Sequence, residues 1–278
     1  MKPVMYRTAG NQALPSPRIW ADCNRADIMD MGTGYWFHEE FTGQPPLAAV
    51  VAATHIGAGH LSIVADTDTV FSSKASELGG YLDIETDADA NDAFTMFSEP
   101  MCKIVKNSGL RVWLEARLEI GDADADQGFF FGLGEEACQS LELVQDDELT
   151  LITETLIGFR IFTGEAAIDC VAQKDDSAEV SILADVTNQT ILDTELGAGN
   201  TGAKAALADA TEMKLGLRFD GKETIFIYVN GVEVIRWTLN ATYYDPTKTL
   251  CVLLALKAGA AAQSIAVDWI RAAYELGA

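Results

Sequence analysis

The sequence predicts an all-β protein folded as a large two-sheet antiparallel sandwich. From residue 35 onward, short β-branched and aromatic segments follow one another, with Gly, Asp and Asn at the breaks between them. Closely spaced strands joined by turn residues are typical of sandwiches. A second observation is the pair Asn230-Gly231 between two β-rich runs, a strong hairpin signal. The chain has 278 residues, 49% of them hydrophobic, which is enough for one substantial core.

Residues 1–34 stand apart from this pattern. They follow neither a strand nor a helix period and contain two prolines, so we expect an irregular N-terminal arm over 1–34. The arm is nevertheless rich in apolar side chains, among them Tyr6, Ile19 and Trp20, which we expect to make contacts. Two alternatives stay open: the arm covers its own domain, or it reaches an adjacent copy or another partner.

The expected strands follow in order along the rest of the chain. Besides the hairpin, they span 35–41, 47–53, 61–65, 80–85, 110–120, 128–134, 156–163, 167–173, 179–186, 213–220, 249–257 and 264–275. Two short stretches, 136–146 and 202–210, are expected to be helical. Because no repeat and no linker divides the strand region, we expect a single sandwich domain over residues 35–278.

The hairpin FIYVNGVEVIRW (226–237) predicts its own register. A two-residue type I′ turn at Asn-Gly pairs Val229 with Val232 and Ile227 with Val234. One face is then aliphatic and belongs to the core: Ile225, Ile227, Val229, Val232 and Val234. The other face is aromatic and mixed, and is either covered by a second layer or used for contact. The predicted contact surface comprises Phe226, Tyr228 and Trp237 of this face, together with Trp113.

The charge of the chain disfavours two classes of partner. Forty-two acidic and nineteen basic residues give a net charge of −23. Binding of nucleic acid or of an anionic membrane needs clustered Lys and Arg, so we expect neither partner. The chain has no long apolar run, and its first residues lack the apolar centre of a secretory signal. An acidic surface suits solubility, a salty environment or a basic protein partner.

The cysteines predict neither disulfides nor a metal centre. Five of them are scattered without a CxxC spacing: Cys23, Cys102, Cys138, Cys170 and Cys251. We expect reduced, mostly buried thiols made in a cytoplasm-like compartment.

Two further motifs have the residue types of metal sites. In HIGAGH, His55 and His60 are five residues apart, and only His38 stands elsewhere, so we expect loop histidines without zinc. The run GDADADQG (121–128) has aspartates at calcium-loop spacing. However, Gln127 and Leu133 occupy the positions where an EF-hand needs Gly and Glu. We expect a solvated acidic turn, and calcium binding at 121–128 stays open.

No catalytic residues are expected. Hydrolysis of a sugar chain needs two carboxylates flanking one bond, and an E-x-D-x-x-E run on a strand would indicate them. The chain has no such run: Glu39 and Glu40 point to opposite faces, and Glu115 and Glu119 lack a third acidic partner. Nucleophile elbows, phosphate-binding glycine loops and HExxH are also missing from the sequence. We therefore expect neither an enzyme nor a cofactor.

Several segments, taken in order, carry a resemblance to a known group of proteins. They are YWFHEEF, LRVWLEARLEI before FFFGLGE, LIGFRIF, LGLRFDGKETIFIYVNG and IAVDWIRAAYE. Over about residues 35–275 their order resembles concanavalin A-like jelly rolls, the architecture of lectins and glucanases. More narrowly, it resembles the jelly-roll structural proteins of tailed bacteriophage virions, in particular capsid decoration proteins. The glucanases of this architecture carry a catalytic acidic run, which this chain lacks.

The resemblance implies a non-enzymatic virion structural protein, most closely a phage capsid decoration or cement protein. Its partners would be the major capsid protein and further copies of itself, in a homo-oligomer on the capsid surface assembled in the host cytoplasm. The alternative is a carbohydrate-binding, lectin-like module on a phage tail or fibre, with Trp113 and Trp237 stacking on sugar rings. An enzyme acting on polysaccharide is a third hypothesis and requires a converging carboxylate pair.

Overall fold

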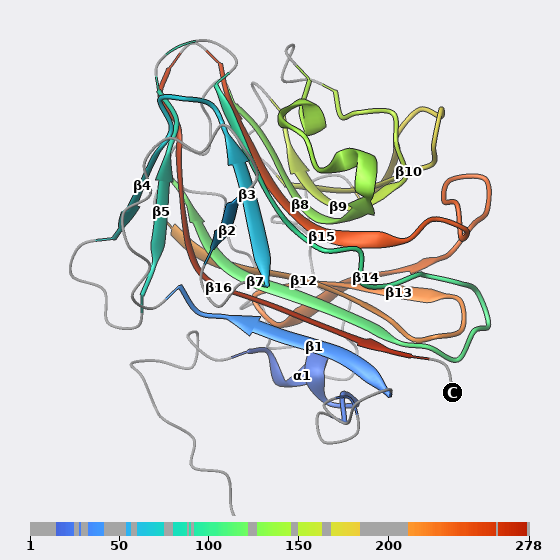
Figure 1. Ribbon diagram of the computed structural model, residues 1–278. Coiled ribbons are helices and arrows are strands. Elements are labelled where there is room, and N and C mark those ends of the chain that lie inside the picture. Colours follow the sequence, from blue (N-terminus) through green and yellow to red (C-terminus); the bar gives the residue numbers. More distant parts are fainter. Residues whose placement is uncertain are drawn as a thin grey trace, which may run out of the picture.

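The computed structural model is a sandwich of two antiparallel β-sheets (Figure 1). It describes residues 15–24, 28, 33–41, 54–56, 60–74, 80–87, 89, 92–121, 127–145, 150–162, 168–183, 211–259 and 261–276. The all-β, jelly-roll fold class expected from the sequence is confirmed. The division into an arm and a domain at residue 34 stays a prediction.

Sheet A has the strand order β14-β13-β12-β7-β16-β5-β4, and β1 also pairs with β16. Its strands are β1 (Gly34–Glu39), β4 (Val70–Ser73), β5 (Leu82–Glu85), β7 (Val112–Ile120), β12 (Thr211–Phe219), β13 (Thr224–Val229), β14 (Val232–Thr238) and β16 (Ser264–Glu275). The long strand β16 pairs with β5 through residues 264–267 and with β1 through residues 270–275.

Sheet B has the order β11-β10-β9-β8-β15-β6-β3-β2. Its strands are β2 (Thr54–Ile56), β3 (Leu61–Ala65), β6 (Ala93–Ser98), β8 (Gln127–Glu135), β9 (Leu156–Ile161), β10 (Asp169–Gln173), β11 (Val180–Leu183) and β15 (Leu250–Ala258). The described helical turns are α1 (Pro17–Trp20), η1 (Glu136–Cys138) and η2 (Leu141–Leu143). In the part of the chain that the structure describes, none of these is long and apolar enough to span a membrane.

The core lies between the two sheets and follows the strand period of two. In β7, Leu114, Ala116 and Leu118 point inward, and Trp113 and Glu115 on the same strand point to the outer face of sheet A. The inward residues of the other central strands join them in one cluster. Full burial of such a side chain stabilises the fold by roughly 1.5–3 kcal/mol. The core covers only the inner face of each sheet, and two smaller clusters of buried residues lie on the outer faces.

The strand pattern of the sequence located most of these elements and missed β2, β4 and β6. All six residues of β6 are buried, because its inner face lies in the core and η2 contacts it on the outer face, so its sequence AFTMFS loses the alternation. The expected helix 136–146 is two 3₁₀ turns, η1 and η2. The expected segments 47–53 and 202–210 lie outside the described residues.

The hairpin has the expected turn and, beyond it, a different register. Asn230 and Gly231 have φ of 50° and 78°, as a type I′ turn requires, and Val229 pairs with Val232. A register shift between Ile227 and Tyr228 then pairs Ile227 with Ile235 in place of Val234.

This shift corrects two expectations about the hairpin. Trp237 lies opposite Ile225 and packs against the core, so it is not on the aromatic face. Of the five expected core residues, Ile225, Ile227 and Val229 are fully buried, and Val232 and Val234 are only partly buried. The reason for the second correction is that β14 is the edge strand of sheet A.

The outer face of sheet B is filled by the segment between β8 and β9, which we call the plug (described over 136–145 and 150–155). Its light-green turns lie against β8, β9 and β15 in Figure 1. Glycines of β8 make room for it: a Cβ on Gly128 would overlap Val144, and one on Gly134 would lie 3.1 Å from the Cys138 sulfur. The Thr95 hydroxyl on β6 donates to the Ser140 carbonyl at 2.7 Å. Gly128 and Gly134 therefore serve the packing of the plug against β8.

Candidate functional site

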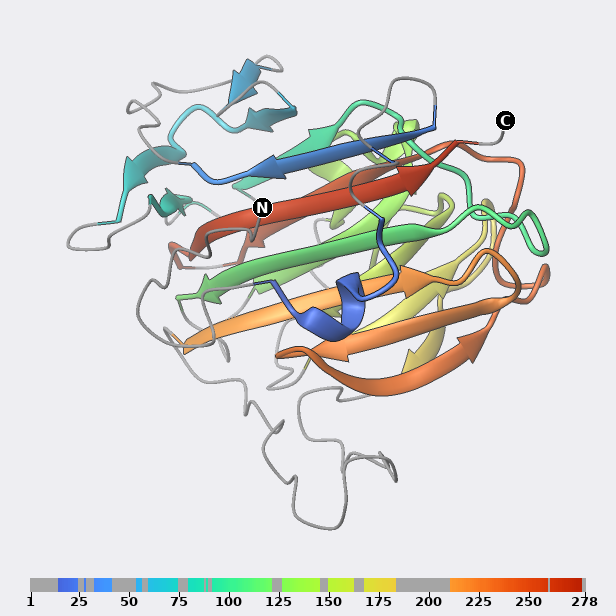
Figure 2. The same ribbon diagram turned by 90° about the horizontal axis from the view of Figure 1, so that it is seen from below.

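The outer face of sheet A carries the N-terminal segment 15–24, which we call the strap. Figure 2 shows α1 lying across this face, and α1 contacts β12. Ile19 is fully buried in a cluster with Trp113 and Tyr228. A Cβ on Gly216 of β12 would lie 2.5 Å from the Ile19 Cδ1 atom, so the glycine opens the space that Ile19 occupies. The strap is thus fitted to the sheet by shape.

A buried carboxylate on β7 fixes the first half of the strap. The backbone N–H of Ser16 donates to both oxygens of Glu115, at 3.2 and 3.0 Å, and the Trp20 indole N–H donates to Oε2 at 2.7 Å. Burial raises the pKa of Glu115, and the hydrogen bonds from Ser16 and Trp20 partly oppose this shift. A carboxylate out of water needs such donors, so Glu115 and the strap depend on each other.

Asp22 fixes the second half of the strap. Its Oδ1 accepts the indole N–H of Trp113 at 3.1 Å, and its Oδ2 accepts from Arg218 at 2.5 Å. The Arg111 guanidinium also donates to Asp22, at 3.1 Å to the backbone carbonyl and 3.4 Å to Oδ2. The strap therefore ends beside Arg111, the residue that precedes β7.

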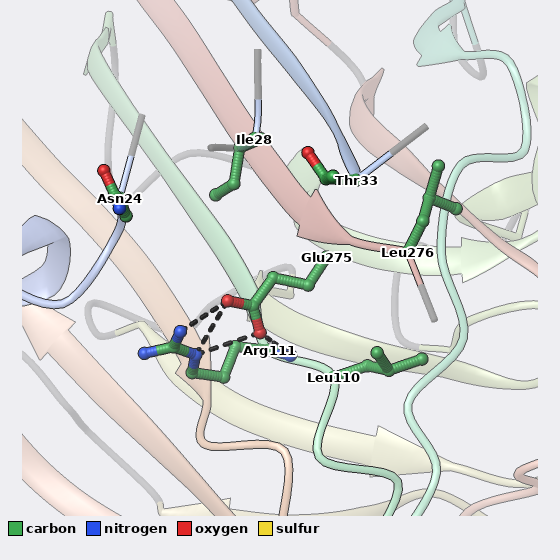
Figure 3. A pocket seen from close by; sticks show the side chains of 7 residues that line it. All are labelled: Asn24, Ile28, Thr33, Leu110, Arg111, Glu275 and Leu276. Carbon is green, nitrogen blue, oxygen red and sulfur yellow. Dashed lines mark hydrogen bonds and ion pairs between the residues drawn. The ribbon is translucent and has the colours of Figure 1, made fainter. Parts of the chain in front are cut away.

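A pocket of about 230 Å³ opens where the strap ends, beside the ends of β7 and β16 (Figure 3). The residues that line it are Asn24, Ile28, Thr33, Leu110, Arg111, Glu275 and Leu276. Arg111 and Glu275 form a forked ion pair, with Nε 3.0 and 2.9 Å from the two carboxylate oxygens and Nη2 2.5 Å from Oε1. Figure 3 shows this pair on one side, with Ile28 and Leu110 on others. Polar and apolar walls therefore face the same small space.

The pocket is accessible and its charges are fixed. The Arg111 side chain is 32% exposed, and Leu276 is 43% exposed. The hydrogen bond to Glu275 raises the pKa of Arg111, so the guanidinium stays charged. Nε and Nη2 of Arg111 donate to Glu275, and Nη1 donates to Asp22, so the pair offers a ligand the remaining Nη N–H groups beside the remaining carboxylate lone pairs. Hydroxyl groups, which both donate and accept, are matched by such a combination.

An arginine surrounded by tryptophans lies next to the strap. The guanidinium of Arg271 on β16 is 5.3, 5.1 and 5.8 Å from the ring centres of Trp20, Trp36 and Trp269. Its Nη2 is 3.1 Å from Nδ1 of His38. These cation–π contacts join the strap to β1 and β16. Arg271 and Trp269 are buried, so the cluster is part of the packing of this face.

Further along β7, a network of ionised groups covers the same face. Arg117 forms ion pairs with Asp268 and Glu212, and the Tyr81 hydroxyl donates to Glu212. Burial raises the pKa of Asp268. For Glu212, burial acts in the same direction, but hydrogen bonds from Tyr81 and Arg117 outweigh it and lower the pKa. The pKa values of these two neighbouring carboxyl groups therefore shift in opposite directions, because Asp268 is more buried and Glu212 accepts hydrogen bonds from two partners.

The predicted contact residues are divided by the structure. Trp113 and Tyr228 are buried beneath the strap, and Phe226 packs beside them. Trp237 lies on the other face, against the core. The four residues therefore do not form one exposed surface. The arm residues Ile19 and Trp20 lie on the chain's own sheet, so the described part of the arm covers its own domain. Tyr6 lies outside the described residues.

The structure describes only part of the two motifs that have the residue types of metal sites, HIGAGH and GDADADQG. His60 stacks on Phe37 with ring centres 5.6 Å apart, and His38 contacts Arg271. His55 belongs to strand β2 and not to a loop, which corrects that expectation, and its side chain lies outside the described part of the structure, as do residues 122–126. Cys102, Cys138, Cys170 and Cys251 are buried thiols, and Cys23 is a half-buried thiol.

An acidic cluster that the sequence did not indicate joins the ends of β8, β9 and β10. Oxygens of Glu135, Glu154 and Asp175 lie within 4.8 Å of one another. The Lys248 ammonium is 2.7 Å from Glu135 and 2.8 Å from Asp175, so a lysine supplies the positive charge there. A hydrogen bond with Glu135, together with burial, raises the pKa of Glu154 to about 7.

No family model matches the chain, and no curated protein matches its sequence. Solved structures do match it. A protein of unknown function from Shewanella oneidensis MR-1 aligns with a TM-score of 0.54 and 13% identity, over 99% of this chain and 97% of the other. Peanut lectin aligns with a TM-score of 0.54 and 10% identity, over 88% and 99%. An uncharacterized protein from Mycobacterium paratuberculosis aligns with a TM-score of 0.50 and 12% identity, over 85% and 99%.

At these identities the likeness shows the fold alone. The fold part of the expected resemblance is confirmed, because the neighbours are concanavalin A-like jelly rolls of the legume-lectin kind. Nothing among these neighbours indicates a phage origin or a capsid role. The chain therefore has the jelly-roll architecture of a lectin, with the outer face of sheet B filled by its own plug and the outer face of sheet A covered in part by its own strap.

Proposed function

We propose that this protein binds carbohydrate, as a lectin-like module, through the pocket beside Arg111 and Glu275. The observation that carries the proposal is the pairing of a fixed guanidinium–carboxylate fork with apolar walls in one accessible pocket. The likeness to peanut lectin supports a carbohydrate-binding role better than a capsid role. A likeness of fold does not determine function, so the proposal rests on the chemistry of the pocket.

The chemistry of the pocket suits a sugar ring. Adjacent hydroxyls of a sugar accept from the Arg111 Nη N–H groups that Glu275 and Asp22 do not use, and donate to the remaining lone pairs of the Glu275 carboxylate. The apolar C–H face of the ring packs on Leu110 and Leu276. At about 230 Å³, the pocket is smaller than the roughly 300–1,000 Å³ that holds a drug-sized ligand. We therefore infer recognition of a single ring, at the end of a glycan.

The test is a glycan array probed with the native chain and two variants. Leu276→Asp places a charge on the apolar wall of the pocket at an exposed position, where the fold tolerates it. Val70→Asp makes the same change at a 56% exposed residue of β4, outside the pocket. Binding by the native chain and by Val70→Asp, with loss in Leu276→Asp, supports the proposal. No glycan bound by the native chain, or equal binding by all three, overturns it.

A virion role is the second candidate. It rests on the resemblance of the segments over 35–275 to capsid decoration proteins and on the net charge of −23, which suits a basic protein partner. In this role the chain adds interface between capsid subunits as one of many symmetric copies, on the virion surface. Mass spectrometry of purified particles tests it, and absence of the chain from particles ends this candidate without affecting the first.

A further inference from the structure

Three connections between the two sheets lie at the same end of the sandwich. They join β3 to β4, β5 to β6 and β15 to β16, through residues 66–69, 86–92 and 259–263. In sheet B, Ala65 at the end of β3 pairs with Phe94 near the start of β6. In sheet A, Glu85 at the end of β5 pairs with Val70 of β4 and with Ser264 of β16. The first residues of β4, β6 and β16 are therefore gathered at this end.

Three polar residues of this end point into the space between the sheets. Each stands two residues before a core side chain of the strand that follows: Thr69, Asp92 and Gln263. The core side chains are, in the same order, Phe71, Phe94 and Ile265. The backbone ladder reaches two of the three, because Ala258 donates to the Asp92 carbonyl at 2.8 Å and Thr86 donates to the Gln263 carbonyl at 2.9 Å. Strand residues two apart share a face, so the three polar side chains continue the inner faces of the sheets.

These inward side chains are buried and lack hydrogen-bond partners. Gln263 is 2% exposed and Thr69 is 3% exposed. Among the described residues, neither amide atom of the Gln263 side chain has a partner, and the same holds for the Thr69 hydroxyl and for Oδ2 of Asp92. Buried polar groups in folded proteins are nearly always hydrogen-bonded, and leaving one without a partner is unfavourable. Several such atoms at one end of the core indicate a bound species that contacts them.

The charge at this end shows what kind of species fits. Burial raises the pKa of Asp92, and four nearby aspartates raise it further: Asp66, Asp89, Asp87 and Asp68. Asp66 is half-buried and accepts the backbone N–H of Ala93 through Oδ2 at 2.9 Å, and the other three aspartates are exposed. The half-buried carboxylate of Asp92 is thus surrounded by like charges. A cation bound beside it removes this repulsion, whereas a water molecule does not.

We propose that this end of the sandwich binds Ca²⁺, with Asp92 as the charged ligand and the side-chain oxygens of Thr69 and Gln263 as neutral ligands. Ca²⁺ takes about six to eight oxygen ligands in a flexible geometry, and water completes the set. Mg²⁺ requires a near-ideal octahedron and suits an irregular set less well. The exposed aspartates attract the cation to the site. The ion would join β4, β6 and β16, and so the two sheets.

The proposal is independent of carbohydrate binding. Gln263 precedes β16 and Glu275 ends it, so the calcium site and the Arg111–Glu275 pocket lie at opposite ends of that strand. Calcium binding at the acidic turn 121–128 is a separate hypothesis, and the variants below distinguish the two.

Titration of the full chain with CaCl₂ tests the proposal, after EGTA treatment and gel filtration. Calorimetry in about 150 mM NaCl, which screens exposed charges, should give a Kd on the order of 10⁻⁵–10⁻³ M. Calcium at about tenfold above the Kd should raise the Tm by roughly 2–4 °C. MgCl₂ at the same concentration is the control for general screening of the net charge of −23 and should raise it less. No calcium binding, or equal effects of the two salts, overturns the proposal.

Two variants keep the shape of the site and remove its ligands. Asp92→Asn removes the charge, and Gln263→Met removes the amide. Without calcium, both should unfold at the native Tm or above it, because they remove a repelled charge and an amide without partners. Each should weaken calcium binding at least about tenfold, since the ligand set determines the affinity. Glu142→Gln, an exposed carboxylate of the plug, is the control for the loss of one charge and should keep the native Kd.

Two results of this comparison overturn the proposal. One is a native Kd in both Asp92→Asn and Gln263→Met, and loss of binding in Asp124→Asn alone would then place the ion at the turn 121–128. The other is a Tm below that of the native chain for both variants without calcium, which would show that the two side chains already have partners in the calcium-free fold.

Discussion

Trp20 and Glu115 are 95 residues apart in the chain and are joined by a 2.7 Å hydrogen bond from the indole N–H to the carboxylate. The same carboxylate accepts the backbone N–H of Ser16. One acidic residue in the middle of a sheet face therefore holds the first half of the strap in place. The segment in turn covers aromatic side chains that would otherwise face water.

The first prediction concerns the strap as part of the fold. Ile19→Ala removes a fully buried side chain from the strap and should lower the free energy of unfolding by about 2–4 kcal/mol. Urea unfolding of the variant measures this. Val70→Ala, at an exposed position, is the control and should change the free energy by less than about 0.5 kcal/mol. Equal stability of Ile19→Ala and the native chain would show that the strap is not packed as described.

The second prediction concerns the glycine that admits the plug. Gly128→Ala pushes a methyl group into Val144 and should lower the free energy of unfolding by about 1–3 kcal/mol. Adding Val144→Ala makes room for that methyl group, so the double variant should be more stable than the sum of the two single effects predicts. A double-mutant cycle by urea unfolding measures the coupling. Strict additivity would mean that the two positions do not compete for space.

The third prediction follows from the hairpin register. Trp237 packs against the core and Arg236 is exposed beside Phe226, so Trp237→Ala should cost about 2 kcal/mol of unfolding free energy. Arg236→Ala is the matched control on the opposite face and should cost about 0.5 kcal/mol or less. Thermal and urea unfolding measure both variants. If Arg236→Ala lowered the free energy of unfolding more than Trp237→Ala, the hairpin would instead have the register without the shift, with Trp237 on the outer face.

The fourth prediction is that the stability of the fold depends on pH through Glu135 and Glu154, the carboxyl groups at the two ends of the plug. Glu154 has a pKa of about 7 in the folded chain against an ordinary value of 4.5, because it shares a hydrogen bond with Glu135 and lies near Asp175. The folded state binds the proton more tightly, so this contribution to stability is complete below about pH 4.5 and is lost as the pH rises through 7. Urea midpoints at pH 5 and pH 8 should differ less for Glu154→Gln than for the native chain. Glu142→Gln, an exposed carboxylate of the plug, is the control and should keep the native difference.

The sequence predicted the fold because the strands of a sandwich are local patterns. The alternation in LRVWLEARLEI already separates core residues such as Leu114 from outer residues such as Glu115, and the structure preserves that separation. The turn at Asn230-Gly231 is equally local. The register shift beside Tyr228 is not, because Val234 and Ile235 are both β-branched and either can face the core.

The candidate site could not be predicted in the same way. Arg111 and Glu275 are 164 residues apart, and they meet only because β7 and β16 lie side by side in sheet A. Trp113 and Tyr228 were expected at a contact surface, and they do make contact, but with the strap of the same chain. Which surface an aromatic side chain meets depends on tertiary packing, and no spacing within one strand encodes it.

The central claim is carbohydrate binding at the Arg111–Glu275 pocket, and titration calorimetry with a glycan identified by the array tests it most directly. The native chain and Val70→Asp should bind with the same Kd, and Leu276→Asp should bind at least about tenfold more weakly, since a single well-placed apolar or hydrogen-bonding contact is worth roughly 1–3 kcal/mol. Unchanged affinity in Leu276→Asp, with the fold intact by circular dichroism, would contradict the account and place carbohydrate binding elsewhere on the molecule.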